Sequence, residues 1–368
     1  MTHIPLVDLA AQHAEVADEV RAGFDTVLAE TSFIGGKAVT AFEEEYARYA
    51  GVQHCIGVGN GTDALEIALR ACGVGVGSEV VLPANTFVAT AEAVVRSGAT
   101  VVLADVDPVT LLLDPSATAA AITPRTRALL PVHLYGQMAD MLAIGDLARR
   151  CDAVVVEDAA QAQGARQEGR PAGAIGVAAG TSFYPGKNLG AYGDAGAVLT
   201  NSESVARLAR SISNHGSERR YHHDVLGFNS RLDTLQAVVL KSKLARLDGW
   251  NAARRRAAQH YDELLAELPD VVLPRTAPGN EHVWHLYVIQ VPDRDAVLAR
   301  LNEAGVGAAV HYPVPVHLHP AFAYLRLRAG QFPVAEAAGD RVLSLPLHPH
   351  LSTDDQVRVA TALAQALR

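Results

Sequence analysis

Short apolar runs alternate with amphipathic stretches over the first half of the chain. Five runs have the length and composition of buried strands, and segments in which apolar residues recur with helical spacing lie between them. The strand-like runs are residues 55–58, 80–82, 100–104, 128–130 and 153–156. The clearest helical segments are residues 62–72, 89–97 and 141–150. This alternation predicts a mainly parallel α/β sheet with helices on both faces.

Polar residues follow four of these runs closely, at the strand ends where ligands gather in parallel sheets. The first run leads into the glycine-rich segment 57–62, and the others are followed by segment 85–87, His133 and Glu157-Asp158. We expect these groups to meet in one pocket, except that Glu157 alternates to the other face of the sheet from Asp158.

The second half of the chain has a different pattern. Long helical segments cover residues 232–247 and 248–268, and a strand-like run at 285–289 and helical segments at 295–304 and from 353 onward follow them. This order indicates a smaller α+β domain. We therefore predict a large domain over residues 1–247 and a small C-terminal domain over residues 248–368.

Composition narrows the classes of protein and of partner. The chain has 368 residues, 49% of them hydrophobic, and its formal charge of −9 argues against a nucleic-acid partner. We expect no membrane segment, because the N-terminus lacks the pattern of a signal peptide and no uncharged apolar run has spanning length. Cys55, Cys72 and Cys151 are unclustered, which favours a reducing cytoplasm over a disulfide framework or a zinc site.

Lysine is rare here. Only four of the 31 basic side chains are lysines, and Lys187 lies in the glycine-rich segment 182–196. A desolvated lysine can lose its proton and attack a carbonyl, whereas arginine stays protonated. Lys187 is thus a candidate Schiff-base lysine; the alternative is a chance lysine in a flexible loop. It is not a P-loop lysine, since Asn188 stands where Ser or Thr is required.

Three further features suit a phosphorylated, nitrogen-containing ring. Segment 57–62 follows a strand and opens a helix, which favours a phosphate, although Thr62 replaces the third glycine of a dinucleotide fingerprint. Asp158 ends an apolar strand and needs a cationic partner such as a protonated pyridine nitrogen; a structural cap or a Mg²⁺ ligand is the alternative. Phe87 could stack on such a ring or belong to the core.

The proline-rich segment 311–320 offers side chains that could hydrogen-bond a sugar. His317 and His319 could share a strand face and bind a metal, but no carboxylate or cysteine accompanies them at ligand spacing, so we expect no metal. The adjacent Arg219 and Arg220 suit either a diphosphate or an ordinary surface.

The motifs, taken in order, resemble those of the sugar-nucleotide aminotransferases of the DegT/StrS type, most closely the members that aminate C3 of a dTDP-3-keto-6-deoxyhexose. These are pyridoxal-phosphate enzymes of the aspartate aminotransferase type I fold. The match runs over nearly the whole chain and comprises residues 33–36, 61–65, 85–90, 156–161, 182–196, 227–233 and 311–313.

The resemblance implies a role for each matching residue. Lys187 would hold pyridoxal 5'-phosphate as an internal aldimine, and Asp158 would pair with its ring nitrogen. Gln161 would face the ring hydroxyl and Phe87 would stack on the ring. The groups on the cofactor phosphate would be Gly61, Thr62, Asp63 through its backbone, Ser182, and Asn229 from the second subunit of a homodimer. The groups near the sugar would be Tyr184, His311 and Tyr312, with Arg220 and Tyr221 reaching across from the partner.

The implied reaction is ping-pong transamination. L-Glutamate would convert the cofactor to pyridoxamine phosphate, which would then aminate a nucleotide-linked keto sugar, with Lys187 moving the proton in both halves. A UDP-linked 3-keto sugar, a C4 keto sugar and a keto-inositol are alternative substrates. Two other classes are a non-catalytic regulatory protein and an NAD-dependent nucleotide-sugar dehydrogenase, and the latter lacks its dinucleotide fingerprint here.

Overall fold

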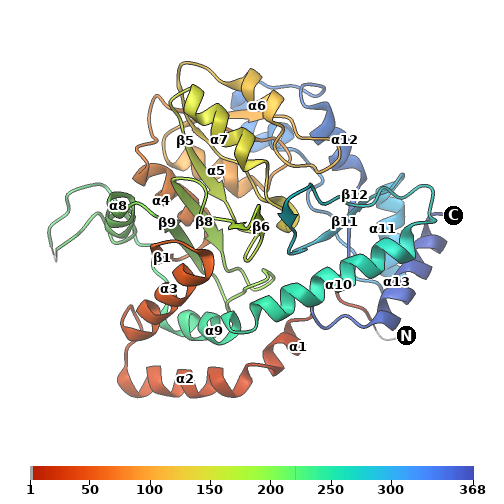
Figure 1. Cartoon of the computed structure of the whole chain (residues 1–368), viewed down its shortest axis with the longest axis horizontal. Coiled ribbons are helices and arrows are strands. Elements are labelled where there is room, and N and C mark those ends of the chain that lie inside the picture. Colours follow the sequence, from red (N-terminus) through yellow and green to blue (C-terminus); the bar gives the residue numbers. More distant parts are fainter. Residues whose placement is uncertain (1–2, 220) are drawn as a thin grey trace.

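The computed structural model of the chain describes residues 3–219 and 221–368. Its centre is a seven-stranded sheet in the order β1-β9-β8-β5-β4-β2-β3 (Figure 1). The strands are β1 (His54–Val58), β2 (Glu79–Pro83), β3 (Thr100–Ala104), β4 (Thr126–Leu129), β5 (Val154–Asp158), β8 (Ala178–Ser182) and β9 (Gly196–Thr200). Within this sheet β9 is antiparallel to both its neighbours, β1 and β8, and the remaining pairs are parallel. The predicted mainly parallel sheet is confirmed.

Strands β8 and β9 were not among the predicted runs, although they border the segment that carries Lys187. Strand β8 reads Ala-Ala-Gly-Thr-Ser and lacks the bulky β-branched residues that mark a strand. Its small residues have a packing reason, because a Cβ on Gly180 would lie 2.8 Å from the side chain of Leu65. Helix α4 therefore lies directly on this strand.

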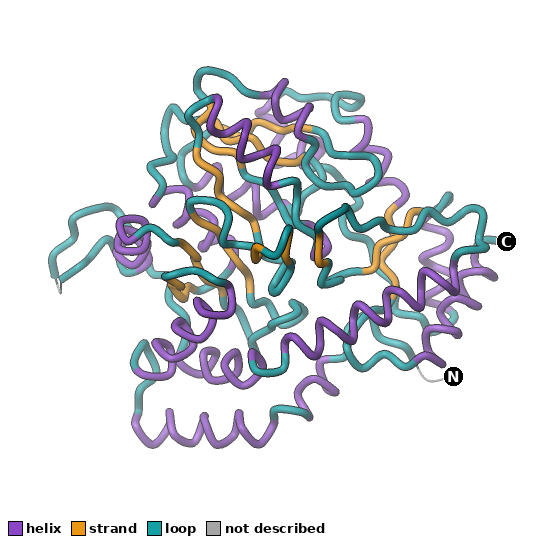
Figure 2. Tube along the Cα trace, in the orientation of Figure 1, coloured by secondary structure: helices purple, strands orange, loops and turns teal. Residues whose placement is uncertain are grey.

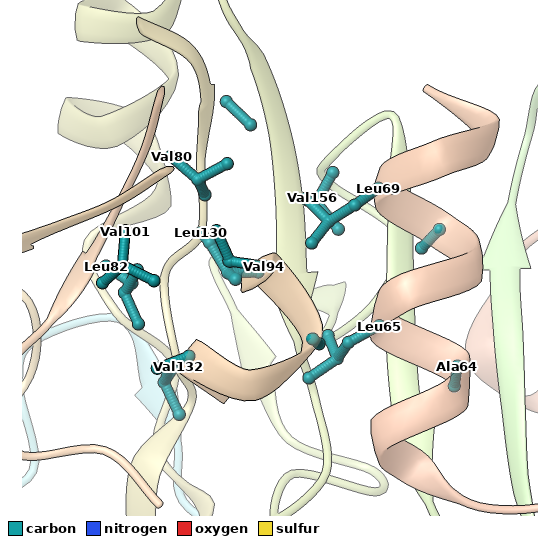
Figure 3. Close-up of a cluster of buried hydrophobic side chains, with 14 of the residues drawn as sticks. Ala64, Leu65, Leu69, Val80, Leu82, Val94, Val101, Leu130, Val132 and Val156 are labelled. Atoms are coloured by element: carbon teal, nitrogen blue, oxygen red, sulfur yellow. The ribbon is translucent and has the colours of Figure 1, made fainter. Parts of the chain in front are cut away.

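Helices cover both faces of the sheet, as Figure 2 shows in a single view of the whole chain. One face packs on α4 (Gly61–Ala71), α5 (Val88–Arg96) and α8 (Glu203–Ser213), and the other on α3 (Lys37–Ala50), α6 (Pro115–Ala121), α7 (Met141–Arg150) and α9 (Thr234–Leu244). Side-chain alternation divides β2 between the two: Val80 and Leu82 join the first core, and Val81 joins the second. In Figure 3, Leu65 and Leu69 of α4 face Val156 across the first core.

The C-terminal part forms a second, smaller α+β unit. Its two-stranded sheet pairs β11 (Tyr287–Gln290) with β12 (Val342–Leu345), and α10 (Leu247–Leu265), α11 (Arg294–Glu303) and α13 (Thr353–Ala366) pack around its core. Ile4 joins this core, and its N–H donates to Gly305 O at 2.9 Å. Helix α10 begins at Leu247, so the boundary proposed between 247 and 248 falls at the start of this long helix.

The remaining elements are short or peripheral. They are α1 (Leu9–Ala14), α2 (Ala17–Glu30), α12 (Pro333–Arg341), the 3₁₀ helices η1 (Leu134–Gly136), η2 (Val316–Leu318) and η3 (Pro320–Leu325), and the small strands β6 (Arg166–Gln167), β7 (Arg170–Pro171) and β10 (Asn280–Glu281). His317 thus lies in a 3₁₀ helix, where its Nε2 is 3.0 Å from Glu336, and the strand face that it was expected to share with His319 does not form. Among the described residues, no helix combines the length and apolar composition that crossing a membrane requires.

Candidate active site

Lys187 lies in the loop between β8 and β9, at the carboxyl edge of the parallel strands. The loop turns tightly there, since the Lys187 N–H donates to Tyr184 O at 2.8 Å. Burial lowers the pKa of Lys187 to about 8, although the negative charge of Asp158 acts in the opposite direction. A substantial fraction of this amine is therefore neutral near pH 8 and able to act as a nucleophile or a base.

Asp158, the last residue of β5, is a buried carboxylate, 5% exposed. Thr90 Oγ1 donates to its Oδ2 at 2.7 Å, and the Ala160 N–H donates to its Oδ1 at 3.1 Å. Burial raises the pKa of Asp158, while these hydrogen bonds and the charge of Lys187 lower it in part. In the described part of the chain no salt bridge joins Asp158 to a cationic side chain, so a cationic group of a ligand would be a favourable partner for this carboxylate.

Gln161, Tyr312 and Phe87 come together beside Asp158. The Tyr135 N–H donates to Gln161 Oε1 at 2.6 Å, and Gln161 Nε2 donates to Tyr312 Oη at 3.1 Å. The Tyr312 ring in turn lies against Phe87, with the ring centroids 5.1 Å apart. These bonds fix the orientation of the Gln161 amide and leave one of its N–H hydrogens for a further acceptor.

His311 lies on the same side of the site. Its Nδ1 is 2.8 Å from Ser344 Oγ, and Tyr135 Oη donates to its carbonyl oxygen at 2.6 Å. Burial and the positive charge of Lys187 lower the pKa of His311 to about 4, so its ring is neutral at physiological pH.

The start of α4 has the geometry of an anion cradle. Asn60 caps the helix by accepting from the Asp63 N–H at 2.8 Å, while in the described chain the N–H groups of Gly61 and Thr62 have no protein acceptor. Ser182 lies against them: a Cβ at position 61 would be 2.6 Å from Ser182 Cβ. The predicted cradle residues are thus brought together, and only a glycine fits at position 61.

The Asp63 side chain points away from this cradle. Its Oδ1 accepts from Arg96 at 2.9 Å and its Oδ2 from Ser230 Oγ at 2.7 Å. Its backbone N–H donates to Asn60, so the contact expected between this N–H and a phosphate stays a prediction.

The residues expected to act across a subunit boundary lie on the outside of this chain. The backbone of Asn229 pairs with that of Asn214, and its side chain is exposed. Tyr221 is 80% exposed, and Tyr184, which was expected only to border the sugar, is 60% exposed. Arg220 lies outside the described residues.

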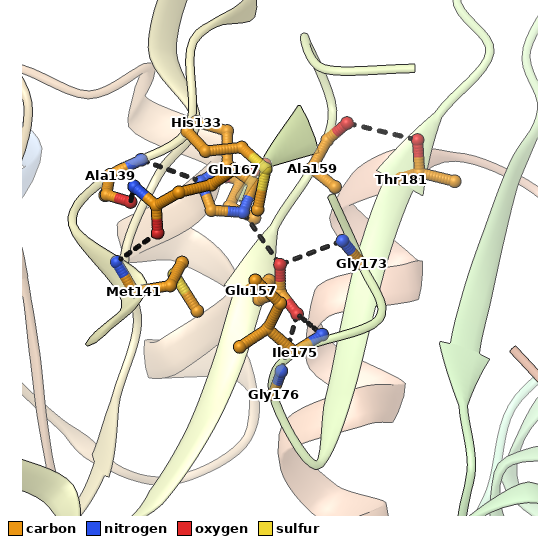
Figure 4. Close-up of polar contacts among 12 residues, drawn as sticks. His133, Ala139, Met141, Glu157, Ala159, Gln167, Gly173, Ile175, Gly176 and Thr181 are labelled. Carbon is orange, nitrogen blue, oxygen red and sulfur yellow. Dashed lines mark hydrogen bonds and ion pairs between the residues drawn. The ribbon is translucent and has the colours of Figure 1, made fainter. Parts of the chain in front are cut away.

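The expectation that His133 lines the pocket is wrong, whereas that for Asn85 stays a prediction. His133 Nε2 is 2.8 Å from Glu157 Oε2 behind the sheet, and neither side chain is exposed (Figure 4). Glu157 lies on the opposite face of the sheet from Asp158, as predicted, and His133 lies on that same face because it contacts Glu157. Asn85 Nδ2 donates to Leu111 O at 2.8 Å.

His285 is a neighbour of the site that the sequence interpretation missed. Its Nδ1 is 3.2 Å from Oδ1 of Asn188, the residue after Lys187. Burial and the charges of Lys187 and Arg254 hold the pKa of His285 well below its usual value. The only hint in the sequence was the position of this histidine just before a strand. Ordinary core residues occupy the same kind of position, so the hint did not identify His285 as part of the site.

These features fit pyridoxal 5'-phosphate. The N–H groups of Gly61 and Thr62, together with Ser182, suit its phosphate. The buried carboxylate of Asp158, which forms no salt bridge among the described residues, suits its ring nitrogen, and the Lys187 amine with its lowered pKa is of the kind that reacts with an aldehyde. The fit rests on groups from β1, β5 and β8, whose carboxyl ends share one edge.

Comparisons with known proteins identify the same architecture and chemistry. The family model described as the DegT/DnrJ/EryC1/StrS aminotransferase family matches residues 14–364. A "pleiotropic regulatory protein" of Geobacillus stearothermophilus is 46% identical, with 100% of this chain and 99% of that protein covered. A dTDP-3-amino-3,4,6-trideoxy-alpha-D-glucose transaminase of Streptomyces venezuelae is 45% identical, with 98% and 96% covered. The crystal structure of S. venezuelae DesV in complex with a ketimine intermediate superposes with a TM-score of 0.97 at 45% identity, with both chains covered completely.

Proposed function

Because the chain belongs to the DegT/DnrJ/EryC1/StrS aminotransferase family, and is thus a pyridoxal-phosphate-dependent enzyme, we propose that it transfers the amino group of L-glutamate to C3 of a dTDP-linked 3-keto-6-deoxyhexose. One observation carries the chemistry: Lys187, an amine with a pKa of about 8, lies in the electrostatic field of Asp158, a buried carboxylate that forms no salt bridge within the described part of the chain. The S. venezuelae relative supports the choice of nucleotide and carbon.

The residues that would hold the cofactor follow from the contacts above. Gly61, Thr62 and Ser182 would bind the phosphate, and the Asp63 N–H would join them by sharing its hydrogen with Asn60 Oδ1. Asp158 would accept the hydrogen bond of the protonated ring nitrogen, Gln161 would meet the ring hydroxyl, and Phe87 would stack on the ring. When bound, this cofactor supplies an electron sink for the carbon whose proton is removed.

Lys187 would then act as the base. Once its Nζ is released as a free amine, the lowered pKa allows it to take a proton from the donor and return one to the sugar carbon. Asp158, held by Thr90 and Ala160, would keep the ring nitrogen protonated throughout.

Sugar recognition would fall to the groups beside the site. The contact between Nδ1 of His311 and Ser344 fixes the orientation of the His311 ring. Because this ring is neutral, it suits a hydroxyl or carbonyl group of the sugar better than a charged group. Tyr312 and the exposed Tyr184 would border the same sugar.

We also propose a homodimer with shared sites. The segment after α8 projects from the body of the molecule, as the left side of Figure 1 shows, and Asn229 and Tyr221 lie exposed in or next to it. In a dimer, Asn229 would complete the phosphate site of the second subunit, and Arg220 and Tyr221 would approach its nucleotide. The free cysteines Cys55, Cys72 and Cys151 suit work in the reducing cytoplasm.

The substrate is tested with the reverse reaction. The loaded protein is incubated with 2-oxoglutarate and one of three amino sugars, namely a dTDP-3-amino, a UDP-3-amino or a dTDP-4-amino sugar, and the glutamate formed is measured by mass spectrometry. We expect the highest kcat/KM with the dTDP-3-amino-6-deoxy sugar. Preference for one of the other two amino sugars would show that the proposed substrate is wrong. If no nucleotide sugar is turned over, or if pyridoxal phosphate gives no visible absorption band with the protein, a non-catalytic regulatory protein would be favoured.

A further inference from the structure

A chain of buried hydroxyl groups leads from Thr86, just before α5, through Thr90 of α5 to the Asp158 carboxylate. Thr86 Oγ1 lies 2.8 Å from Thr90 Oγ1, which lies 2.7 Å from Asp158 Oδ2. The three residues are 2%, 1% and 5% exposed, so bulk water does not compete for these bonds. Thr86 has no part in the proposed reaction, and neither threonine is in the set of groups that contact the cofactor.

The direction of these bonds follows from the number of hydrogens. An ionised carboxylate only accepts, so the single hydroxyl hydrogen of Thr90 points to Asp158. Thr90 Oγ1 must then accept from Thr86, whose own hydrogen is spent in that bond. A threonine within a helix commonly donates to the carbonyl one turn earlier, and Thr90 gives up that bond for Asp158.

We propose that Thr90, supported by Thr86, is a positioning residue that orients Asp158 and keeps it ionised opposite the cofactor ring nitrogen, an inference that rests on the proposed function. The two carboxylate oxygens are each held by a neutral donor, Thr90 Oγ1 and the Ala160 N–H, which prevents the group from rotating. Neutral donors stabilise the anion without neutralising it. The negative charge therefore remains available to the ring nitrogen.

The expected effect of losing the Thr90 hydroxyl concerns the proton that lies between Asp158 and the ring nitrogen of the cofactor. Without the Thr90 hydroxyl, the Asp158 carboxylate is a stronger base in an apolar site, so the proton between Asp158 and the ring nitrogen moves toward Asp158. The ring nitrogen then carries less positive charge and attracts electrons less strongly.

The test compares Thr90→Val, which keeps the shape but removes the hydroxyl, with Thr90→Ser, which keeps the hydroxyl. Each protein is loaded with pyridoxal phosphate labelled with ¹⁵N in the ring, and the ¹⁵N chemical shift and the cofactor dissociation constant are measured. For Thr90→Val we expect a shift toward the unprotonated nitrogen and an affinity roughly 10-fold weaker, because the carboxylate that meets the ring nitrogen is no longer held in a fixed orientation. Thr90→Ser should restore both.

Thr86→Val is the second variant, because it leaves the Thr90 hydroxyl in place and removes only its donor. We expect a change of the same sign and smaller size. Wild-type shift and affinity in both valine variants would overturn the proposal, as would an effect of Thr90→Ser equal to that of Thr90→Val. If Thr90→Val does not fold, an unchanged ¹⁵N shift in Thr86→Val alone overturns it. An unprotonated ring nitrogen in the wild type would instead show that the proposed pairing with Asp158 is wrong.

Discussion

His133 Nε2 lies 2.8 Å from Glu157 Oε2, and both side chains are completely buried on the face of β5 opposite the site. Glu157 also accepts from the N–H groups of Gly173, Ile175 and Gly176 at 2.8, 2.8 and 2.6 Å (Figure 4). The carboxylate therefore ties the turn before β8 to β5. Since Asp158 is the next residue, this network anchors the strand end that presents the Asp158 carboxylate to the candidate site.

We expect Glu157→Gln to lower the free energy of unfolding by roughly 3–5 kcal/mol, because it breaks a buried pair and brings an NH₂ group toward donors. Urea denaturation of the apoprotein measures this. The exposed Glu303 provides the matched control, and Glu303→Gln should change the stability little. Equal stability of the two variants would contradict the role given to Glu157.

The contribution of Glu157 should depend on pH. Burial raises the pKa of Glu157, but the hydrogen bond and charge of His133 and the Gly176 and Gly173 N–H groups outweigh it, and the net pKa lies below its usual 4.5. A carboxyl whose folded-state pKa is lowered stabilises the fold above its unfolded pKa and loses this contribution as the pH falls through its folded pKa. The stability difference between wild type and Glu157→Gln should thus be constant near pH 7 and shrink below about pH 4.5, as urea midpoints between pH 7 and 3 would show.

Lys187 should react with the cofactor in a pH-dependent way. Only the neutral amine attacks an aldehyde, so the rate at which apoprotein binds pyridoxal phosphate should rise as the pH increases through about 8. Stopped-flow absorbance follows this rate, and Lys187→Ala should give no visible band. Because the charge of Asp158 raises the Lys187 pKa, Asp158→Asn should move the midpoint to lower pH; movement to higher pH would contradict the coupling.

Gly61→Ala should damage the phosphate cradle. The added Cβ would meet Ser182 Cβ at 2.6 Å, which forces β8 and the start of α4 apart. We expect cofactor affinity to fall at least tenfold, roughly the effect of losing one hydrogen bond to a charged phosphate, as measured by fluorescence titration. Gly145→Ala, at a helical position with no atom within 4 Å of its Cβ, is the control and should bind normally.

The shared dimer site predicts complementation between two inactive variants. Asn229→Asp would place a negative charge against the cofactor phosphate of the second subunit, and Lys187→Ala would lose the base. A mixed dimer would contain one site with an intact Lys187 and an intact Asn229, so mixing after mild dissociation should restore activity. Absence of recovery, with mixed dimers demonstrated by mass spectrometry, would contradict the assignment of Asn229.

Much of the α/β pattern could be predicted from the sequence because apolar and polar residues separate cleanly there. Helix α7 spans Met141–Arg150 and strand β3 spans Thr100–Ala104, the ranges that the patterns predict. Strand β8 could not be predicted, since its alanines and glycine are chosen for contact with α4 rather than for strand propensity.

The site was predictable only where one residue carries the chemistry. Lys187 and Asp158 stand out by type and position, whereas His285 and Thr90 act through contacts with residues 97 and 68 positions away, Asn188 and Asp158. Single-chain periodicity contains no information on such pairs. The misplacement of His133 has the same cause, because its partner is set by which face of β5 Glu157 occupies.

The rarity of lysine also bears on how the protein can be attached to a surface. Lys187 is partly buried in the candidate site, and Lys243 is 2% exposed, with its Nζ donating to Gly190 O at 2.7 Å. The exposed lysines, Lys37 and Lys241, lie on α3 and α9, two helices packed against each other. Coupling through lysine side chains would therefore attach the molecules mainly at these two neighbouring helices, which limits the orientations that they take on a support.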